Sequence, residues 1–549
     1  MSVVQVIPLG GVGEIGKNCT VIRQDDDMVV IDCGLSFPTE EMLGVDIVIP
    51  DFTYLRENKD KIRGIFLTHA HEDHVGALPY ILPDLPGVPV YATEFTHALI
   101  HNKLEERIGT KSLNLKTYKP GDIIQCGAIS VEPVRVTHSI PESYCMAIRT
   151  KHGIVFMTGD FKFDFTPVDG KLAQITRIGE IGTEGVVLLL SDSTNVDRPG
   201  WGPSEREASN GIRLVMNTAP GRVLLTTFAS NIHRLQQLLD VAAETGRKVA
   251  VVGRRMEQNL DICSRLGYIK VPKNVHIRLD ELRMYPDNQV AILTTGSQGE
   301  PMSALVQMSK GEYGRLQIKN GDTVIYSARP IPGNEGAIWR TINRLFRQGA
   351  NVIYKSATPI HVSGHAYQEE LKMMINLTRP YYIAPVHGEP RHQHIYNEMA
   401  GAMGYPEHRI FTLKDGIPLN LEETSASFGE PVPFGRVLVD TGGTPGVTDD
   451  VLRDRFNIAR DGIIVLTIVV DVEKGEIAGD PVLQARGFHA PEGTLDHAFD
   501  VLYDALRAMS REELKDVGRL RHDVADVVKK MIHKRTSLRP LVLPTIVEV

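Results

Sequence analysis

The sequence predicts an α/β protein of several domains, in which a β-rich first domain is interrupted by a second α/β domain and followed by a smaller third one. The length of 549 residues exceeds what one ordinary hydrophobic core organises, which favours three or four folding units. Short β-branched runs dominate the first part of the chain, whereas helix and strand patterns alternate further on. The hydrophobic content of 42% and the charged content of 23% are typical of globular chains and exclude disordered and fibrous classes.

The first domain begins as a series of short strands separated by Gly, Pro and Asp turns. This composition predicts a mostly antiparallel β region. We expect its strands at residues 3–8, 20–23, 28–32, 64–68, 88–92, 129–136, 144–149 and 153–158.

A glycine-rich segment within this region resembles a dinucleotide site but lacks the required context. Residues 11–16 fit the pattern G-x-G-x-x-G, and an acidic residue, Asp32, follows about twenty residues further on. A dinucleotide site needs a helix after the third glycine, whereas residues 19–32 are typical of a β-hairpin. The sequence therefore predicts no dinucleotide site.

Helical periodicity becomes prominent in the second domain. We expect helices at residues 231–245, 256–266 and 335–347 and strands at 248–252, 290–295 and 323–327. This alternation predicts a parallel sheet. Strand-ended segments that carry histidines resume after about residue 350, at residues 352–354 and 381–384, so the second domain is predicted to be an insertion into the first.

These patterns give the predicted domain boundaries. The first domain comprises residues 1–205 and 351–421, the inserted domain 206–350, a proline-stiffened linker 422–448 and the C-terminal domain 449–549. The last of these is expected to contain a strand at 462–472, helices at 495–509 and 512–533, and a strand at 541–549. One apolar stripe along its last helix indicates that this helix packs on a core, and we expect the domain to mediate dimerisation.

Charge, cysteine usage and hydropathy limit the function classes. The net charge of −8 argues against coating of nucleic acid through bulk charge, although bound metal ions add local positive charge that this sum omits. The apolar run 463–470 is far shorter than the ~20 residues needed to span a bilayer, so we expect no membrane association. The N-terminus lacks a secretory pattern and the five cysteines form no Cys-x-x-Cys pair, which favours the cytoplasm.

The strongest chemical signal is the run Thr68-His-Ala-His-Glu-Asp-His74. It follows an apolar strand and precedes a helix-like segment. Imidazole and carboxylate groups are suitable ligands for first-row metals. In an extended loop His69 and His71 point the same way, while Asp73 and His74 can turn towards a neighbouring site. The motif therefore predicts a centre that holds two ions.

This run resembles the signature of the metallo-β-lactamase superfamily, which implies a four-layer αββα sandwich. The resemblance extends to Asp32, His138 and Asp160, each at the end of a predicted strand. It implies that one ion is held by His69, His71 and His138, that the other is held by Asp73, His74 and a later histidine, and that Asp160 bridges both. Asp32 is implied to orient the loop and its hydroxide from outside the ligand set.

The insertion is similar to that of the β-CASP branch, whose members act on nucleic acids. Asp192, His365 and His387 match its carboxylate and two histidines in order and context. The resemblance implies that His387 completes the second metal site and that His365 is the general acid, kept protonated by Asp192. Metal-bound hydroxide, oriented by Asp73 as base, would then attack a phosphodiester.

The whole pattern, including residues 10–18, resembles the ribonuclease J family over nearly the entire chain. The family implies a 5′→3′ exonuclease that prefers single-stranded RNA with a 5′ monophosphate, has some endonuclease activity and acts in RNA decay and in rRNA and mRNA maturation. It also implies two divalent ions per subunit, zinc or else manganese, a homodimer or homotetramer, and other RNA-decay proteins as partners. The family's phosphate-contacting loops correspond to Ser230, Asn231, His361, Ser363 and Gly364.

Two other function classes remain as alternatives. One is a metallohydrolase of a different substrate, such as a DNA nuclease or a small thioester or lactam hydrolase. The other is a non-catalytic scaffold in an RNA-decay assembly. The filled ligand positions argue against the scaffold, and the insertion with its Asp192 and His365 argues against a small substrate.

Overall fold

The computed structural model describes residues 3–109, 113–331, 333–355 and 358–549. The chain divides into two compact units. The first comprises Met1–Thr39 and Ile47–Val437, and the second comprises Glu40–Asp46 and Leu438–Val549. Each unit is described by itself below.

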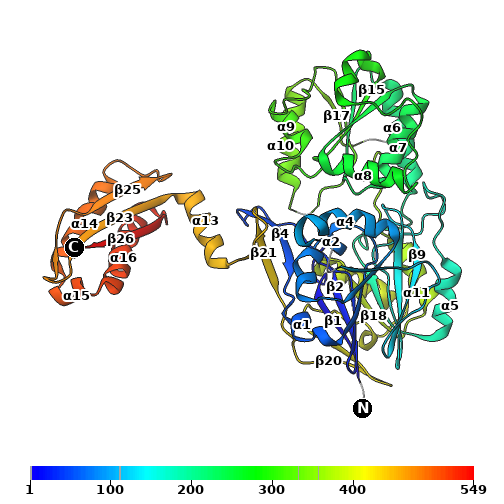
Figure 1. Cartoon of the computed structure of the whole chain (residues 1–549), viewed down its shortest axis with the longest axis horizontal. Helices are drawn as coiled ribbons and strands as arrows, with labels where there is room; N and C mark the ends of the chain where they lie inside the picture. Colours follow the sequence, from blue (N-terminus) through cyan, green and yellow to red (C-terminus); the bar gives the residue numbers. More distant parts are fainter. Residues whose placement is uncertain (1–2, 110–112, 332, 356–357) are drawn as a thin grey trace. The chain divides into compact units, whose positions relative to one another are not determined.

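Two sheets packed face to face form the centre of the first unit (Figure 1). One sheet has the order β20-β19-β1-β2-β3-β5-β6-β7, and the other has the order β18-β12-β11-β10-β9-β8. The strands of the first sheet are β1 (Val4–Gly10), β2 (Cys19–Gln24), β3 (Asp27–Ile31), β5 (Ile62–Phe66), β6 (Pro89–Ala92), β7 (Asn114–Thr117), β19 (Leu419–Leu421) and β20 (Ala426–Phe428). Those of the second are β8 (Ile124–Cys126), β9 (Ile129–Val136), β10 (Ser143–Thr150), β11 (Gly153–Met157), β12 (Val186–Asp192) and β18 (Tyr382–Val386).

Helices cover the outer faces of both sheets and complete four layers (Figure 1). The short helices α1 (Thr53–Glu57), α2 (Glu72–Val75) and α3 (Leu78–Ile81) and the longer α4 (Glu94–Ile108) lie on the side of the first sheet. On the outer face of the second sheet, α5 (Ile175–Gly185), α11 (Gln368–Thr378) and α12 (Pro390–Ala402) bury apolar residues against the strands. The predicted αββα sandwich is confirmed.

The strands of this sandwich are less uniformly antiparallel than the sequence suggested. β1, β2 and β3 pair antiparallel, as do β8, β9, β10 and β11. However, β3, β5, β6 and β7 are parallel neighbours, as are β11, β12 and β18. Helices or long loops connect these parallel neighbours, as a parallel crossover requires. Because parallel strands end at the same edge, several chemically active residues that follow strands are brought together there.

The insertion forms its own five-stranded parallel sheet with the order β14-β15-β13-β16-β17. Its strands are β13 (Val223–Thr226), β14 (Lys248–Val252), β15 (Val290–Thr294), β16 (Thr323–Tyr326) and β17 (Asn351–Ile353). Apolar clusters lie on both faces, beneath α6 (Glu205–Thr218), α7 (Ile232–Glu244) and α8 (Arg254–Arg265) on one side and α9 (Ala304–Lys310) and α10 (Glu335–Arg347) on the other. β17, which we expected after the insertion, pairs with β16 and therefore belongs to this sheet.

The segment predicted as an extended linker contains strands. β20 adds to the edge of the first sheet by pairing with β19, because residues 426–428 align with residues 419–421 in a tight hairpin. β21 (Arg436–Asp440) and β22 (Pro445–Val447) form a second hairpin.

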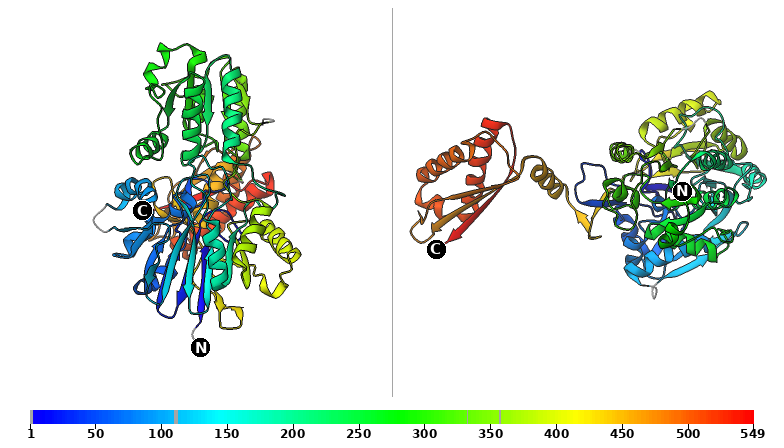
Figure 2. Two further views of the ribbon diagram at one scale, coloured as in Figure 1. Left: turned by 90° about the vertical axis from the view of Figure 1, so that its right-hand side faces the viewer. Right: turned by 90° about the horizontal axis from the view of Figure 1, so that it is seen from above.

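The second unit is a four-stranded sheet with helices packed on it (Figure 2). β23 (Ile463–Asp471) pairs with β24 (Glu476–Ile477), β25 (Val482–Arg486) and β26 (Leu541–Glu548). α14 (Thr494–Ala508) and α16 (Val517–Thr536) bury their apolar stripes on one face of this sheet. The predicted helix 512–533 is divided into α15 (Arg511–Lys515) and α16, because Asp516 caps the second helix by accepting from the amide of Arg519. Among the described residues, no helix is both long and apolar enough to cross a membrane.

Candidate metal centre and active site

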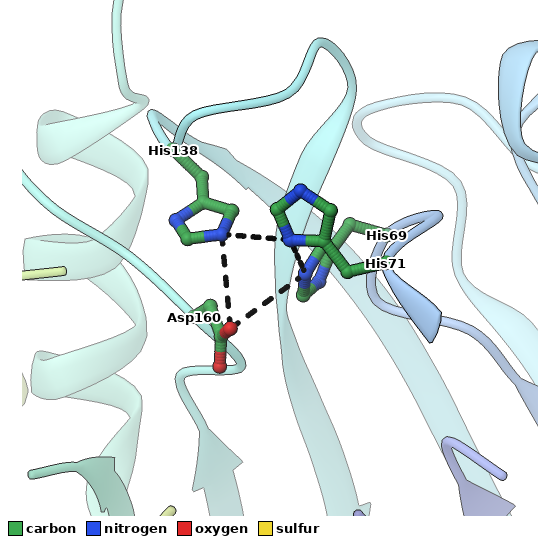
Figure 3. A group of neighbouring side chains, drawn as sticks. All are labelled: His69, His71, His138 and Asp160. Atoms are coloured by element: carbon green, nitrogen blue, oxygen red, sulfur yellow. Dashed lines mark hydrogen bonds and ion pairs between the residues drawn. The ribbon is translucent and has the colours of Figure 1, made fainter. Parts of the chain in front are cut away.

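Three histidines and one aspartate form a buried cluster at the edge where the sandwich strands end (Figure 3). His69 and His71 follow β5, His138 follows β9 and Asp160 follows β11. The Nε2 atoms of His69 and His138 lie 3.0 and 3.1 Å from Nδ1 of His71. Each of the same two Nε2 atoms is 3.7 Å from Oδ2 of Asp160. One potential ligand atom from each residue therefore converges on one point.

A second ligand set lies on the other side of the same carboxylate. Oδ1 of Asp160 is 3.2 Å from Nε2 of His74 and 3.6 Å from Nδ1 of His387. Oδ2 of Asp73 is 3.1 Å from Nε2 of His387 and 3.7 Å from Nε2 of His74. Asp160 thus directs one oxygen to each set, which is the arrangement that a carboxylate bridging two ions requires.

Contacts outside the two sets control the orientation of the imidazoles. Asp32 is fully buried and binds Nδ1 of His74 at 2.7 Å, which turns Nε2 towards Asp160. Nδ1 of His138 donates to the carbonyl of Gly364 at 2.8 Å and leaves its Nε2 lone pair free. Such hydrogen bonds fix the tautomer and the ring direction of a metal ligand.

Similar support for His387 and for the loop of residues 69–74 comes from residues that sequence reasoning missed. The hydroxyl of Thr194 is 2.8 Å from Nδ1 of His387 and donates to its backbone carbonyl at 2.9 Å. The side-chain amide of Asn18 donates to the carbonyl of Asp73 at 3.0 Å. Thr194 lies two residues after Asp192, and Asn18 ends the glycine-rich segment. Their nearness to these motifs is the only feature of the sequence that could have indicated a role for them at the site.

The electrostatics of the cluster suit a divalent cation. Burial and neighbouring imidazoles lower the pKa of His69 and His138, and burial lowers the pKa of His71 to about 4, so these rings are neutral, as metal binding requires. Burial alone opposes ionisation of Asp160, but the surrounding histidines hold its pKa well below the usual value. Oδ1 of this buried carboxylate has no hydrogen-bond partner in the described chain. Neutral imidazoles lie on the side of Oδ2, whereas on the side of Oδ1 the carboxylates outweigh burial and raise the pKa of His74 and, to about 10, that of His387. A bound cation would take the place of the protons on these two rings, so the cluster fits metal binding.

A carboxylate–histidine pair lies beside the two ligand sets. Nδ1 of His365 is 2.8 Å from Oδ2 of Asp192, and Nε2 of His365 is 3.9 Å from Oδ2 of Asp160. Burial disfavours the imidazolium, but the charges of Asp192 and Asp160 outweigh this effect and raise the pKa of His365. A protonated imidazole is therefore positioned with its second nitrogen directed into the centre. Asp192, His365 and His387 could also hold an ion by distance alone.

The expected phosphate-contacting residues lie on two loops that end strands of the insertion. Ser230 and Asn231 follow β13, and Oδ1 of Asn231 caps α7 by accepting from the amide of Arg234 at 3.0 Å. In the second loop, the side-chain amide of Asn195 donates to Oγ of Ser363 at 2.8 Å. Nδ1 of His361 is buried and has no hydrogen-bond partner in the described chain.

The glycine of that second loop serves the metal centre through its backbone. A Cβ at Gly364 would approach the ring of His138 to 2.6 Å, so a side chain cannot be accommodated there without displacement of that ring. Together with the hydrogen bond from His138 to its carbonyl, this contact places Gly364 against a predicted metal ligand.

The glycine-rich segment between β1 and β2 also supports the centre. The carbonyl of Gly11 accepts from the amide of His387 at 2.8 Å, and the amide of Asn18 donates to the carbonyl of Asp73 at 3.0 Å. β2 follows directly and forms a hairpin with β3, as predicted. The segment therefore holds two loops, one before and one after the insertion.

Asp415 lies near this segment and makes the stability of the chain depend on pH. Burial, followed by the charge of Glu14, raises the pKa of Asp415 to about 7. The folded chain therefore binds a proton at the Asp415 carboxyl more tightly than the unfolded chain does. The resulting contribution to the free energy of unfolding is fully present below about pH 4 and is lost as the pH rises to about 7. We expect Asp415→Asn to raise the free energy of unfolding at pH 8 by roughly 1–3 kcal/mol and to have little effect at pH 4. Urea unfolding at both pH values tests this; an equal effect at both would contradict it.

Four family models match consecutive parts of the chain. A metallo-beta-lactamase superfamily model matches residues 12–182, and a model of the ribonuclease J beta-CASP domain matches residues 220–345. A Zn-dependent metallo-hydrolase RNA specificity domain matches residues 350–409, and a ribonuclease J C-terminal domain matches residues 450–549.

Full-length relatives agree with these models. Ribonuclease J of Thermus thermophilus is 44% identical over 99% of this chain and 95% of its own length. The chain belongs to the ribonuclease J family. Ribonuclease J2 of Bacillus subtilis is 38% identical over 100% of this chain and 99% of its own, and ribonuclease J of Synechocystis is 44% identical over 88% and 75%.

A solved structure shows the same fold in a more distant protein. A protein of unknown function from Enterococcus faecalis aligns with a TM-score of 0.56 and 18% identity, over 76% of this chain and 100% of that one. Membership of the ribonuclease J family makes this chain a metal-dependent ribonuclease of the metallo-β-lactamase superfamily. The alternatives of a small-molecule hydrolase and of a non-catalytic scaffold are thereby set aside.

Proposed function

We propose that the chain degrades single-stranded RNA from a 5′ monophosphate in the 5′→3′ direction, with some endonuclease activity, in cytoplasmic RNA decay and in rRNA and mRNA maturation. The observation that carries this proposal is the shared carboxylate of Asp160, which faces two ligand sets beside the His365–Asp192 pair. Two metal sets and a separate acid are the groups needed for in-line hydrolysis of a phosphodiester.

We assign two divalent ions per subunit, zinc or else manganese, to the two ligand sets. When bound, they supply Lewis acidity to the phosphodiester and lower the pKa of water. Asp73 orients the attacking group from the edge of the second set, and Asp32 holds His74 in its ligating orientation. His365 donates a proton to the leaving 3′ oxygen, and Asp192 keeps that imidazole charged.

The two insertion loops bind the phosphates of the strand. Ser230 and Asn231 lie at the N-terminus of α7, where backbone amides and the helix dipole favour an anion. His361 and Ser363 lie on the second loop, which continues directly into His365. Because the loop that binds phosphate also carries the acid, binding of RNA positions the scissile bond next to the proton donor.

One experiment tests the direction, end preference and sugar specificity together. RNA of one sequence, labelled at either end and carrying a 5′ monophosphate or triphosphate, is incubated with the full chain alongside the matching DNA. We expect the 5′-labelled RNA to release labelled mononucleotide from the first time point. Release should be faster from the 5′-monophosphate than from the 5′-triphosphate RNA, and the DNA should not be cleaved. Shortening from the 3′ end, or equal rates on both 5′ ends, would contradict the proposal.

We further propose that the C-terminal unit, residues 449–549 by the predicted boundaries, mediates assembly into a homodimer or homotetramer. One face of its sheet packs on α14 and α16, whereas the opposite face carries exposed apolar side chains. Val482, Leu543 and Val547 are 49%, 49% and 41% exposed there. A contiguous apolar sheet face of this kind is typical of a protein interface.

Charge on this face should weaken the association of subunits. For the double variant L543E/V547E we expect a rise of at least about tenfold in the dissociation constant, because two carboxylates cannot be buried unpaired in an apolar interface. Sedimentation equilibrium measures the change. The control is Leu214→Glu, which alters an equally exposed residue of α6 (53%) in the first unit. If the double variant and the control sediment alike, the assigned face is wrong.

A further inference from the structure

Two exposed aromatic side chains lie together on loops next to the proposed active site. Phe165 is 58% exposed and Trp201 is 50% exposed, and their ring centroids are 6.1 Å apart with an interplanar angle of 52°. Large rings are usually buried, so an exposed pair is uncommon, and the residues around it decide whether it contacts a ligand. Neither ring belongs to the ligand sets or to the acid pair described above.

A buried lysine connects this pair to the second of the two proposed phosphate-binding loops, residues 361–364. Lys162 is 2% exposed, and its ammonium donates to the carbonyl of Pro203 at 3.1 Å and to the carbonyl of Ser363 at 3.3 Å. Pro203 lies two residues after Trp201, and Ser363 is one of the proposed phosphate contacts. The aromatic pair and the phosphate loop are therefore held by one shared cation.

A buried glutamate joins the two loops that carry the aromatic rings. Glu370 is fully buried, and its two oxygens accept from the amides of Phe163 at 2.9 Å and Gly202 at 2.8 Å. Phe163 is two residues before Phe165, and Gly202 follows Trp201. Both rings are thus carried on fixed backbone, which lowers the entropic cost of binding a ligand between or upon them.

The surroundings indicate the chemistry of the ligand. Phe165 lies five residues after Asp160, so the pair is continuous along the chain with the metal centre. The exposed cations Arg198 and Arg206 lie on either side of Trp201 in the sequence. Exposed aromatic rings with arginines nearby in the sequence, on loops joined to a proposed phosphate-binding loop, are elements with which proteins bind unpaired bases of a single strand.

We propose that Phe165 and Trp201 form a base-stacking site for the RNA strand whose 5′ end occupies the metal centre. This inference rests on the proposed RNA hydrolysis at that centre and adds to it a site that holds the strand between successive cleavages. Since every base has an aromatic face, the site accepts any sequence but requires unpaired bases. It contributes to binding of the strand and takes no part in the chemical step.

The test uses the full chain and a ladder of 5′-monophosphorylated RNAs from two to twenty nucleotides. For F165A/W201A we expect KM to rise by about tenfold or more on RNAs long enough to reach the pair. On dinucleotides KM should stay within about twofold of the wild-type value, and kcat should be unchanged at all lengths. W201F should restore most of the loss, because phenylalanine retains a stacking face. In a twenty-nucleotide RNA that is abasic beyond its second nucleotide, the double variant and the wild type should have the same KM.

A matched control separates this role from general loss of surface aromatics. Trp339 and Tyr354 form another exposed pair, with centroids 5.3 Å apart and exposures of 45% and 40%, and W339A/Y354A should leave KM unchanged at every length. An unchanged KM of F165A/W201A on long RNA overturns the proposal, and so does an equal loss on abasic RNA. Weakened self-association without a change in KM would assign the pair to a protein interface instead. If the wild-type chain fails to cleave any RNA of the ladder, the proposed function fails, and that result is distinct from all of these.

Discussion

Asp160→Ala should abolish RNA hydrolysis, with a loss of at least about 10³-fold in kcat/KM, and should remove bound metal from both sites together. The reason is geometric, since Oδ2 of Asp160 faces the set of His69 and His138 while Oδ1 faces His74 and His387. Metal content by plasma mass spectrometry and cleavage of labelled RNA provide the two measurements.

The matched control is Asp169→Ala, which removes an exposed carboxylate from the same segment of the chain. It should keep both metal content and rate. If the Asp160→Ala protein retains two ions per chain and cleaves RNA at the normal rate, the assignment of Asp160 to both ligand sets is wrong.

His365→Ala should lower kcat by about 10²- to 10⁴-fold while leaving metal content intact, because the residue is assigned to proton donation rather than to metal binding. The defect should shrink strongly on a phosphodiester with a p-nitrophenolate leaving group, which departs without protonation. Asp192→Asn should give the same pattern with a smaller loss, since it removes the charge that raises the pKa of His365.

This pair of measurements also decides between the two possible roles of the third cluster. If His365→Ala lowers metal content and slows both substrates equally, then Asp192, His365 and His387 bind an ion and the acid lies elsewhere. His394→Ala is the control, because this exposed histidine on α12 lies outside all three clusters.

The elements that the sequence predicted well are those whose signal is local. β9 has the expected bounds, and the expected strand 248–252 and helix 335–347 coincide with β14 and α10. Local periodicity and turn residues decide such elements. The metal motif was equally readable, since four of its side chains lie within six residues.

Predictions that depended on tertiary pairing were less accurate. β17 belongs to the insertion because it pairs with β16, and β20 is a strand because β19 offers it an edge. Neither partner can be recognised from the segment itself. The support given to His138 by Gly364 joins residues 226 positions apart, and that given to His387 by Thr194 joins residues 193 apart. Sequence spacing carries no information about such contacts.

The closing of the first sheet has a consequence for synthesis of the protein on the ribosome. β1 pairs with β19, so that Val4 faces Leu421, and His387 is supplied only after the entire insertion has been made. A nascent chain that ends within the insertion lacks His387 of the second ligand set, the proposed proton donor His365 and the strand β19 that pairs with β1. We therefore expect a chain that is truncated within the insertion to have no ribonuclease activity, and activity to require synthesis beyond residue 387.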